Sequence, residues 1–137
     1  MYDLSPVYPR AGKGLLSGRY PTSVALDPQG MHIRYGSGKI RSWGWEDSRS
    51  WLILSDMRES IAQGIISSES APFRLTRAAF SAILLTEPAG LAILDAARAA
   101  GRRLVKRRDV FPRTRVICTV YAEADSFYAR VGRWQPA

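Results

Sequence analysis

Residues 24–54 read VALDPQGMHIRYGSGKIRSWGWEDSRSWLIL, and this stretch decides the fold. The tetrad at 27–30, DPQG, has proline second and glycine last, which is typical of a type I turn. Met31, Ile33 and Tyr35 then alternate with polar residues, as in a half-buried strand. A second turn at 36–38 and the apolar run at 51–54 complete four short strands. The stretch therefore predicts an antiparallel meander.

The third of these strands carries a mixed face that contains cations and aromatic rings. We call it the aromatic face, and it consists of Lys39, Arg41, Trp43 and Trp45. Such a mixture can form a platform for single-stranded nucleic acid. Alternatively, the two tryptophans face the core while the two cations extend to solvent. We favour the second interpretation, because tryptophan is large and is highly buried on average.

This stretch, together with FRLTRAAFS at 73–81, resembles bacterial pleckstrin-homology-like domains of the YcxB-like group. The resemblance covers roughly residues 20–105. It implies an α+β fold in which a PH-like antiparallel barrel or sandwich is closed by one helix. Two departures are that the membrane spans preceding many such domains are not found here, and that the chain continues to 137. We expect an irregular arm at 1–19, the PH-like domain at 20–105 and a strand–helix extension at 106–137, packed on the same domain.

The composition is that of a globular protein, with 137 residues of which 46% are hydrophobic. A single cysteine, Cys118, excludes an internal disulfide framework, and on its apolar strand face it is expected to be a small core residue. No secretory leader is found, so a cytoplasmic location is expected.

The stretch 78–97 is long enough to span a membrane. Because Glu87 and Pro88 fall at its middle, we expect the start of a helix there and no transmembrane segment.

That helix is predicted over about 87–107, capped by Thr86. Its expected buried face consists of Leu91, Leu94, Ala97, Gly101 and Leu104. Strands are predicted at 61–66 and 73–76 before this helix and at 116–121 after it. The spacing of apolar residues from 124 to 131 predicts a last short helix.

Most of the net charge of +8 lies in one segment, 98–115, which holds eight basic residues and one acidic residue. The rest of the chain has 12 basic and 11 acidic residues. The basic residues are Arg98, Arg102, Arg103, Lys106, Arg107, Arg108, Arg113 and Arg115. A solvated helix face is the simplest interpretation. A patch for nucleic acid and a patch for an anionic membrane surface are the alternatives.

No catalytic, metal or cofactor site is predicted. The sequence GSGK at 36–39 lacks the glycine and the Ser or Thr that a phosphate-binding loop requires, and it joins two strands. His32 is the only histidine, and without an identified partner it is expected to be a surface residue.

A second resemblance concerns RVICTVYAEADSFYARVGRW at 115–134, which is similar to the end of GCN5-related N-acetyltransferases. There Ala124, Phe127, Tyr128 and Gly132 match a strand-following helix, and Tyr128 would be the candidate general acid. However, 86–90 lacks the glycine-rich loop with which that family holds the pyrophosphate of acetyl-coenzyme A.

We therefore expect a non-enzymatic interaction module that binds a protein partner or an anionic surface through a basic C-terminal helix. The alternatives are a degenerate N-acetyltransferase-like protein, a basic nucleic-acid-binding protein, and a component of a larger assembly whose neighbours cover the Trp and Arg surfaces.

Overall fold

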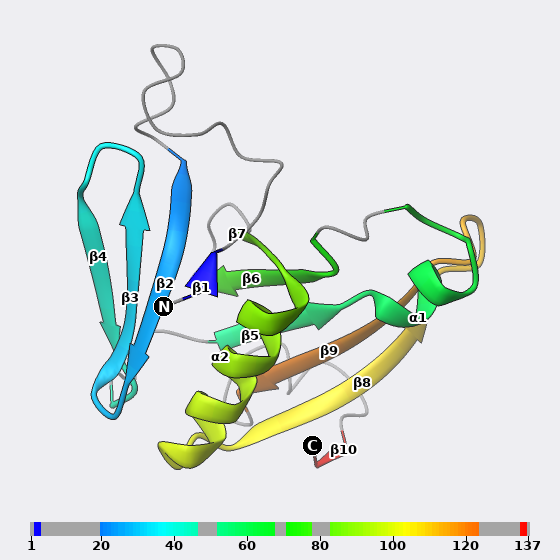
Figure 1. Ribbon diagram of the computed structural model, residues 1–137. Coiled ribbons are helices and arrows are strands. Elements are labelled where there is room, and N and C mark those ends of the chain that lie inside the picture. Colours follow the sequence, from blue (N-terminus) through cyan, green and yellow to red (C-terminus); the bar gives the residue numbers. More distant parts are fainter. Residues whose placement is uncertain are drawn as a thin grey trace.

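Two antiparallel sheets and two helices make up the computed structural model, which describes residues 2–3, 20–46, 52–67, 71–77, 83–123 and 135–136 (Figure 1). The four-stranded sheet has the order β1 (Tyr2–Asp3), β2 (Pro21–Asp27), β3 (Gly30–Tyr35), β4 (Ile40–Gly44). The six-stranded sheet has the order β10 (Gln135–Pro136), β8 (Leu104–Val110), β9 (Ile117–Glu123), β5 (Leu52–Asp56), β6 (Phe73–Arg77), β7 (Ile83–Leu85). The helices are α1 (Arg58–Ala62) and α2 (Glu87–Ala99).

The expected α+β class dominated by antiparallel strands is confirmed, but the described strands form two sheets and no closed barrel. The meander is correct for β2, β3 and β4, which pair in succession. Its fourth strand was wrongly placed, because β5 belongs to the other sheet and pairs with β6 and β9. All three residues of Leu52–Leu54 are buried, as expected for a strand with neighbours on both edges and cover on both faces.

One hydrophobic core is shared by both sheets and by α2, which in Figure 1 lies in front of the six-stranded sheet and beside β2. Met31 and Ile33 come from the four-stranded sheet, Phe73 comes from the six-stranded sheet, and Ile93 comes from α2. Gly90 allows the closest approach, since a Cβ at this position would lie 2.3 Å from the Phe73 ring. The absent side chain thus lets α2 pack directly on β6.

The predicted helix start is confirmed, but its predicted end is wrong. Thr86 accepts a hydrogen bond from the Ala89 N–H at 3.4 Å, as an N-cap does. The helix ends at Ala99 because Gly101 takes a left-handed conformation with φ +84°. The N–H groups of Gly101 and Arg102 then donate to carbonyls of the last helical turn, which is a Schellman motif. Residues 104–110 consequently form a strand.

The strand predicted at 61–66 is also wrong. The Arg58 N–H donates to Asp56 Oδ1 at 2.9 Å, and the chain turns from β5 into α1 at this point. Gly64, with φ +72°, follows the short helix. The strands predicted at 73–76 and 116–121 are confirmed as β6 and β9.

The described part of 106–137 contributes to three strands of the larger sheet: β9 pairs with β5 on one side and β8 on the other, and β10 pairs with β8 at the edge. Within the expected arm, Tyr2 and Asp3 form β1 against β2. The remainder of the arm and the helix expected from 124 lie outside the described residues. Among the helices described, none is long and apolar enough to cross a membrane.

Candidate anion-binding site

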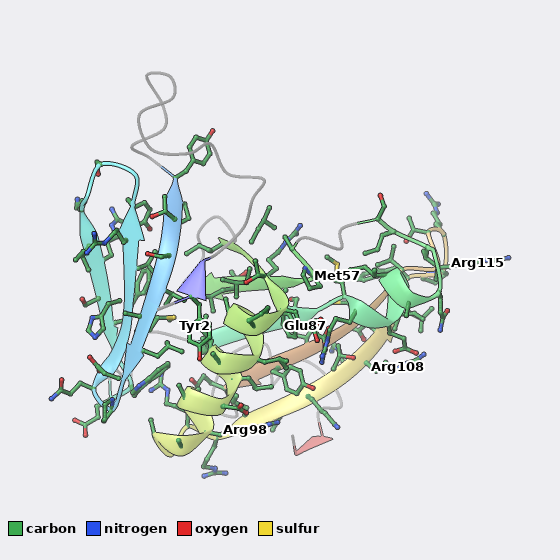
Figure 2. The ribbon with its side chains drawn as sticks, viewed as in Figure 1. Tyr2, Met57, Glu87, Arg98, Arg108 and Arg115 are labelled. Carbon is green, nitrogen blue, oxygen red and sulfur yellow. The ribbon has the colours of Figure 1, made fainter. Side chains whose placement is uncertain are left out.

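The expected contact through a basic C-terminal helix is wrong in its element, because the basic residues of 98–115 are distributed along β8 and its two ends. Arg98 lies in the last turn of α2, and Arg102 and Arg103 follow between α2 and β8. Lys106, Arg107 and Arg108 lie on β8, while Arg113 and Arg115 lie in the turn between β8 and β9. Figure 2 shows Arg98 and Arg115 at opposite ends of β8, which spans roughly 20 Å. The helix end and the hairpin turn are therefore two separate groups of cations.

Three of these cations are held in ion pairs. Arg108 donates to both carboxylate oxygens of Glu59, at 2.9 and 2.6 Å, and these bonds lower the pKa of Glu59. Arg107 Nε lies 3.0 Å from Asp109. Arg102 Nε lies 2.8 Å from Glu123 Oε1, where both side chains are largely buried. These three arginines serve the fold.

The remaining cations face solvent without an acidic partner in the described ranges. They are Arg98, Arg103, Lys106, Arg113 and Arg115, and all of them are exposed. Arg98 differs from the others because its guanidinium carbon lies 5.7 Å from the centre of the Tyr121 ring, a cation–π contact. As far as the described residues go, the charges of the other four are open to an external anion.

The turn between β8 and β9 is closed by its own backbone. The Phe111 N–H donates to the Val116 carbonyl at 2.9 Å, and the Arg115 N–H donates to the Phe111 carbonyl at 2.7 Å. Arg115 has φ 60°, a left-handed conformation that is unfavourable for any residue with a Cβ. Glycine would fit this position with less strain, yet the position carries a cation.

The hairpin is anchored at its base by α1. The register that pairs Asp56 with Thr119 would place position 58 opposite Ile117, but the chain has already turned into α1 there. The buried hydroxyl of Ser60 replaces the missing strand. It donates to the Ile117 carbonyl at 3.0 Å and accepts a hydrogen bond from the Ile117 N–H. The pair Glu59–Arg108 adds a second contact between α1 and β8.

The aromatic face is a partly buried structural surface. Trp45 is buried, and its Nε1–H donates to the Asp27 carbonyl at 2.9 Å. Trp43 packs against the core, whereas Lys39 and Arg41 are exposed. Our interpretation that both tryptophans face the core is supported by these contacts. Stacked bases could not reach Trp45 in this arrangement.

His32 has partners that the sequence did not reveal. Its Nε2 is hydrogen-bonded to Asp27 Oδ2 at 2.7 Å, and its Nδ1 is hydrogen-bonded to the Ser42 hydroxyl at 2.7 Å. The register of the predicted β3–β4 hairpin pairs His32 with Ser42, so the contact between these two residues could have been inferred from the sequence. Hydrogen bonds from Gly30, His32 and Gln29 lower the pKa of Asp27. A serine, a histidine and an aspartate are also the groups of acyl-transfer triads, but the imidazole here is reversed relative to that arrangement, with Nδ1 toward the serine and Nε2 toward the aspartate.

A hollow of about 390 Å³ lies beside this cluster, between the β2–β3 turn and the last turn of α2. It is lined by Leu26, Asp27, Pro28, Ala96, Ala99 and Ala100. Among the described lining residues, Asp27 is the one charged group, and its carboxylate is hydrogen-bonded within the turn. The described lining is otherwise apolar.

The start of α2 and the cysteine also have structural roles. Glu87 forms an ion pair with Arg58 at 3.2 Å, and Gly90 allows α2 to contact Phe73. These two residues of the 86–90 segment therefore have structural roles. Cys118 is buried, as expected, and burial raises the pKa of its thiol. The acetyltransferase residues from Ala124 to Gly132 lie outside the described residues.

Comparison with known proteins adds no relative to this picture: no protein-family model matches the chain, and no curated protein or solved structure is significantly similar to it.

Proposed function

We propose that this protein is a non-enzymatic interaction module that contacts an anionic partner surface through the β8–β9 hairpin. The observation that carries the proposal is the difference among its cations. Arg102, Arg107 and Arg108 are ion-paired within the fold. Arg113 and Arg115, in contrast, are exposed at the turn without an acidic neighbour in the described part of the chain.

Arginines in this setting suit a phosphate or carboxylate partner. A guanidinium presents several donors in a planar fork and can bind two oxygens of one anion. Backbone hydrogen bonds close the turn that carries both arginines, so less backbone freedom is lost on binding. Lys106 and Arg103 extend the positive surface along β8 toward α2.

The relation to pleckstrin-homology-like domains and the cytoplasmic location remain part of this proposal. Two antiparallel sheets that share a core with one long helix support the relation at the level of layers. A free, buried Cys118 is compatible with a reducing compartment.

Retention on a heparin column at low salt tests the anionic contact, with heparin as the probe. We expect the wild-type protein to be retained, because Lys and Arg displace counterions from a polyanion. The double variant R113Q/R115Q should elute at clearly lower salt. The matched control is R34Q/R74Q, which removes the same charge from two exposed arginines on β3 and β6.

Equal elution of the two double variants would show that only net charge matters and that the hairpin is a solvated surface. Failure of the wild-type protein to bind at low salt would remove the proposal altogether.

A further inference from the structure

The β8–β9 turn exposes apolar side chains next to its free cations. In the described residues, four large hydrophobic side chains are exposed, and two of them, Val110 and Phe111, are neighbours at this turn. Each is 51% exposed. Pro112 follows them and is also exposed. Arg113 and Arg115 complete the segment, which we call the hairpin tip (residues 110–115).

The apolar residues lie on both sides of the tip. Val110 pairs with Ile117 at the end of the β8–β9 ladder, and the hydrogen bond from Phe111 to Val116 continues the hairpin by one residue. Since neighbouring strand residues point to opposite faces, Val110 and Phe111 emerge on opposite sides. A flat protein surface would cover only one of these sides. A fluid apolar layer would cover both.

The cations are placed as a bilayer surface requires. Arg113 and Arg115 are a few residues from the apolar pair, and long basic side chains can reach headgroups while apolar neighbours enter the boundary region. Figure 2 shows Arg115 at the outer end of the hairpin, beyond α1, so the tip projects from the fold. A nucleic acid would use a row of aromatic rings, and the tip offers one ring and an aliphatic side chain.

We infer that the hairpin tip inserts Val110 and Phe111 into the surface of an anionic lipid bilayer, while Arg113 and Arg115 bind the lipid headgroups. This inference rests on the proposed function and names the partner of the same hairpin. The anion is a lipid headgroup. The apolar pair supplies hydrophobic contact with the bilayer, which a soluble polyanion could not provide.

Co-sedimentation with vesicles of phosphatidylcholine, with and without phosphatidylserine, tests the inference. We expect the full chain to bind only the vesicles that contain phosphatidylserine. Phe111→Ser should weaken this binding roughly tenfold, as expected for the loss of a half-buried aromatic side chain. Arg113→Gln and Arg115→Gly should each weaken it about fivefold. Phe111→Trp should strengthen it, because tryptophan favours the membrane interface.

Two control variants separate the tip from general surface effects. Ile40→Ser removes a hydrophobic side chain of the same exposure, 52%, from the β3–β4 hairpin, and it should bind as the wild type does. Arg115→Gly suits the left-handed conformation at this position, so its weaker binding should come with no loss of thermal stability.

The possible outcomes distinguish the bilayer inference from the broader proposal of an anionic contact. Retention on heparin without vesicle binding would overturn the bilayer inference and leave the anionic contact intact. Vesicle binding that Phe111→Ser does not weaken would overturn the insertion of the tip. Concentration-dependent self-association that Phe111→Ser abolishes would assign the tip to a second copy of this chain and also overturn the inference. Binding to neither heparin nor vesicles would end both proposals.

Discussion

Two turns of this molecule, β2–β3 and β8–β9, each reverse the chain between antiparallel strands, but they differ in how far their side chains take part in hydrogen bonds. In the β2–β3 turn, Asp27 accepts hydrogen bonds from the Gln29 and Gly30 N–H groups at 2.8 and 2.9 Å. Its second oxygen binds His32, and its carbonyl accepts from Trp45. In the β8–β9 turn, the one side-chain hydrogen bond found among described residues is from the Val116 N–H to Thr114 at 3.4 Å.

The difference separates a turn that stabilises the fold from a turn that presents side chains. The first turn connects three strands, because Asp27 is hydrogen-bonded to Gly30, His32 and Trp45. The second turn is closed by backbone bonds and anchored from outside by Ser60, so its own side chains are not needed for folding. Substitutions should therefore affect stability at the first turn and binding at the second.

The largest stability effect is expected at Gly30. A Cβ at this position would lie 2.1 Å from the Trp43 carbonyl oxygen, which belongs to the paired strand and cannot move without breaking the ladder. Gly30→Ala should lower the free energy of unfolding by about 3 kcal/mol, measured by urea denaturation. Its matched control is Gly44→Ala, on the residue paired with Gly30, where the added Cβ would lie 3.5 Å from its nearest neighbour and should be tolerated. Equal losses for the two variants would contradict the view that the β2–β3 turn is tightly constrained.

A smaller loss of stability is expected at the anchor of the second hairpin. Ser60→Ala would leave the buried N–H and carbonyl of Ile117 without their partner. The free energy of unfolding should fall by about 2 kcal/mol. Amide exchange should become faster at Ile117. Ser67→Ala, at an exposed serine, is the control and should have little effect on either measurement. Unchanged exchange at Ile117 in Ser60→Ala would mean that the hairpin is not anchored from α1.

The smallest effect is expected at Asp27 and depends on pH. Its folded-state pKa is lowered, chiefly by the Gly30 N–H and then by His32, so the ionised carboxylate stabilises the fold. This contribution is present above the ordinary pKa of 3.8 and is lost as the pH falls through the lower folded-state value. Asp27→Asn should lower the urea midpoint near neutral pH, and the difference from the wild type should shrink on acidification. A difference that stays constant down to acidic pH would show that the charge of Asp27 has no such role.

Local signals in the sequence were sufficient for the elements that are determined by neighbouring residues. The DPQG turn, the alternation in β3 and the Thr86 cap all depend on contacts within a few residues, and each is found in the structure. Gly101 was misinterpreted because its spacing from Leu94 and Ala97 fits a helix face. Its ability to adopt positive φ, which ends the helix, is a competing property of the same residue.

The pairing of strands that lie far apart in the sequence could not be predicted from such local signals. Nothing near Leu54 shows that its partner is Tyr121, because the pairing depends on the whole arrangement of strands. The same applies to the candidate site. The sequence located its cations, but whether Arg108 or Arg113 has an acidic partner depends on where Glu59 lies in space.

The position of β9 has a consequence for the synthesis of this protein. Ile53 pairs with Ala122, so β5 acquires its second neighbour only after β9 has left the ribosome. Until then, one edge of β5 has unpaired backbone groups beside the apolar residues Leu52–Leu54. Such a segment is prone to aggregate with other nascent chains. Pairing with β9 thus completes the sheet around β5 and also protects the earlier-made strand from aggregation.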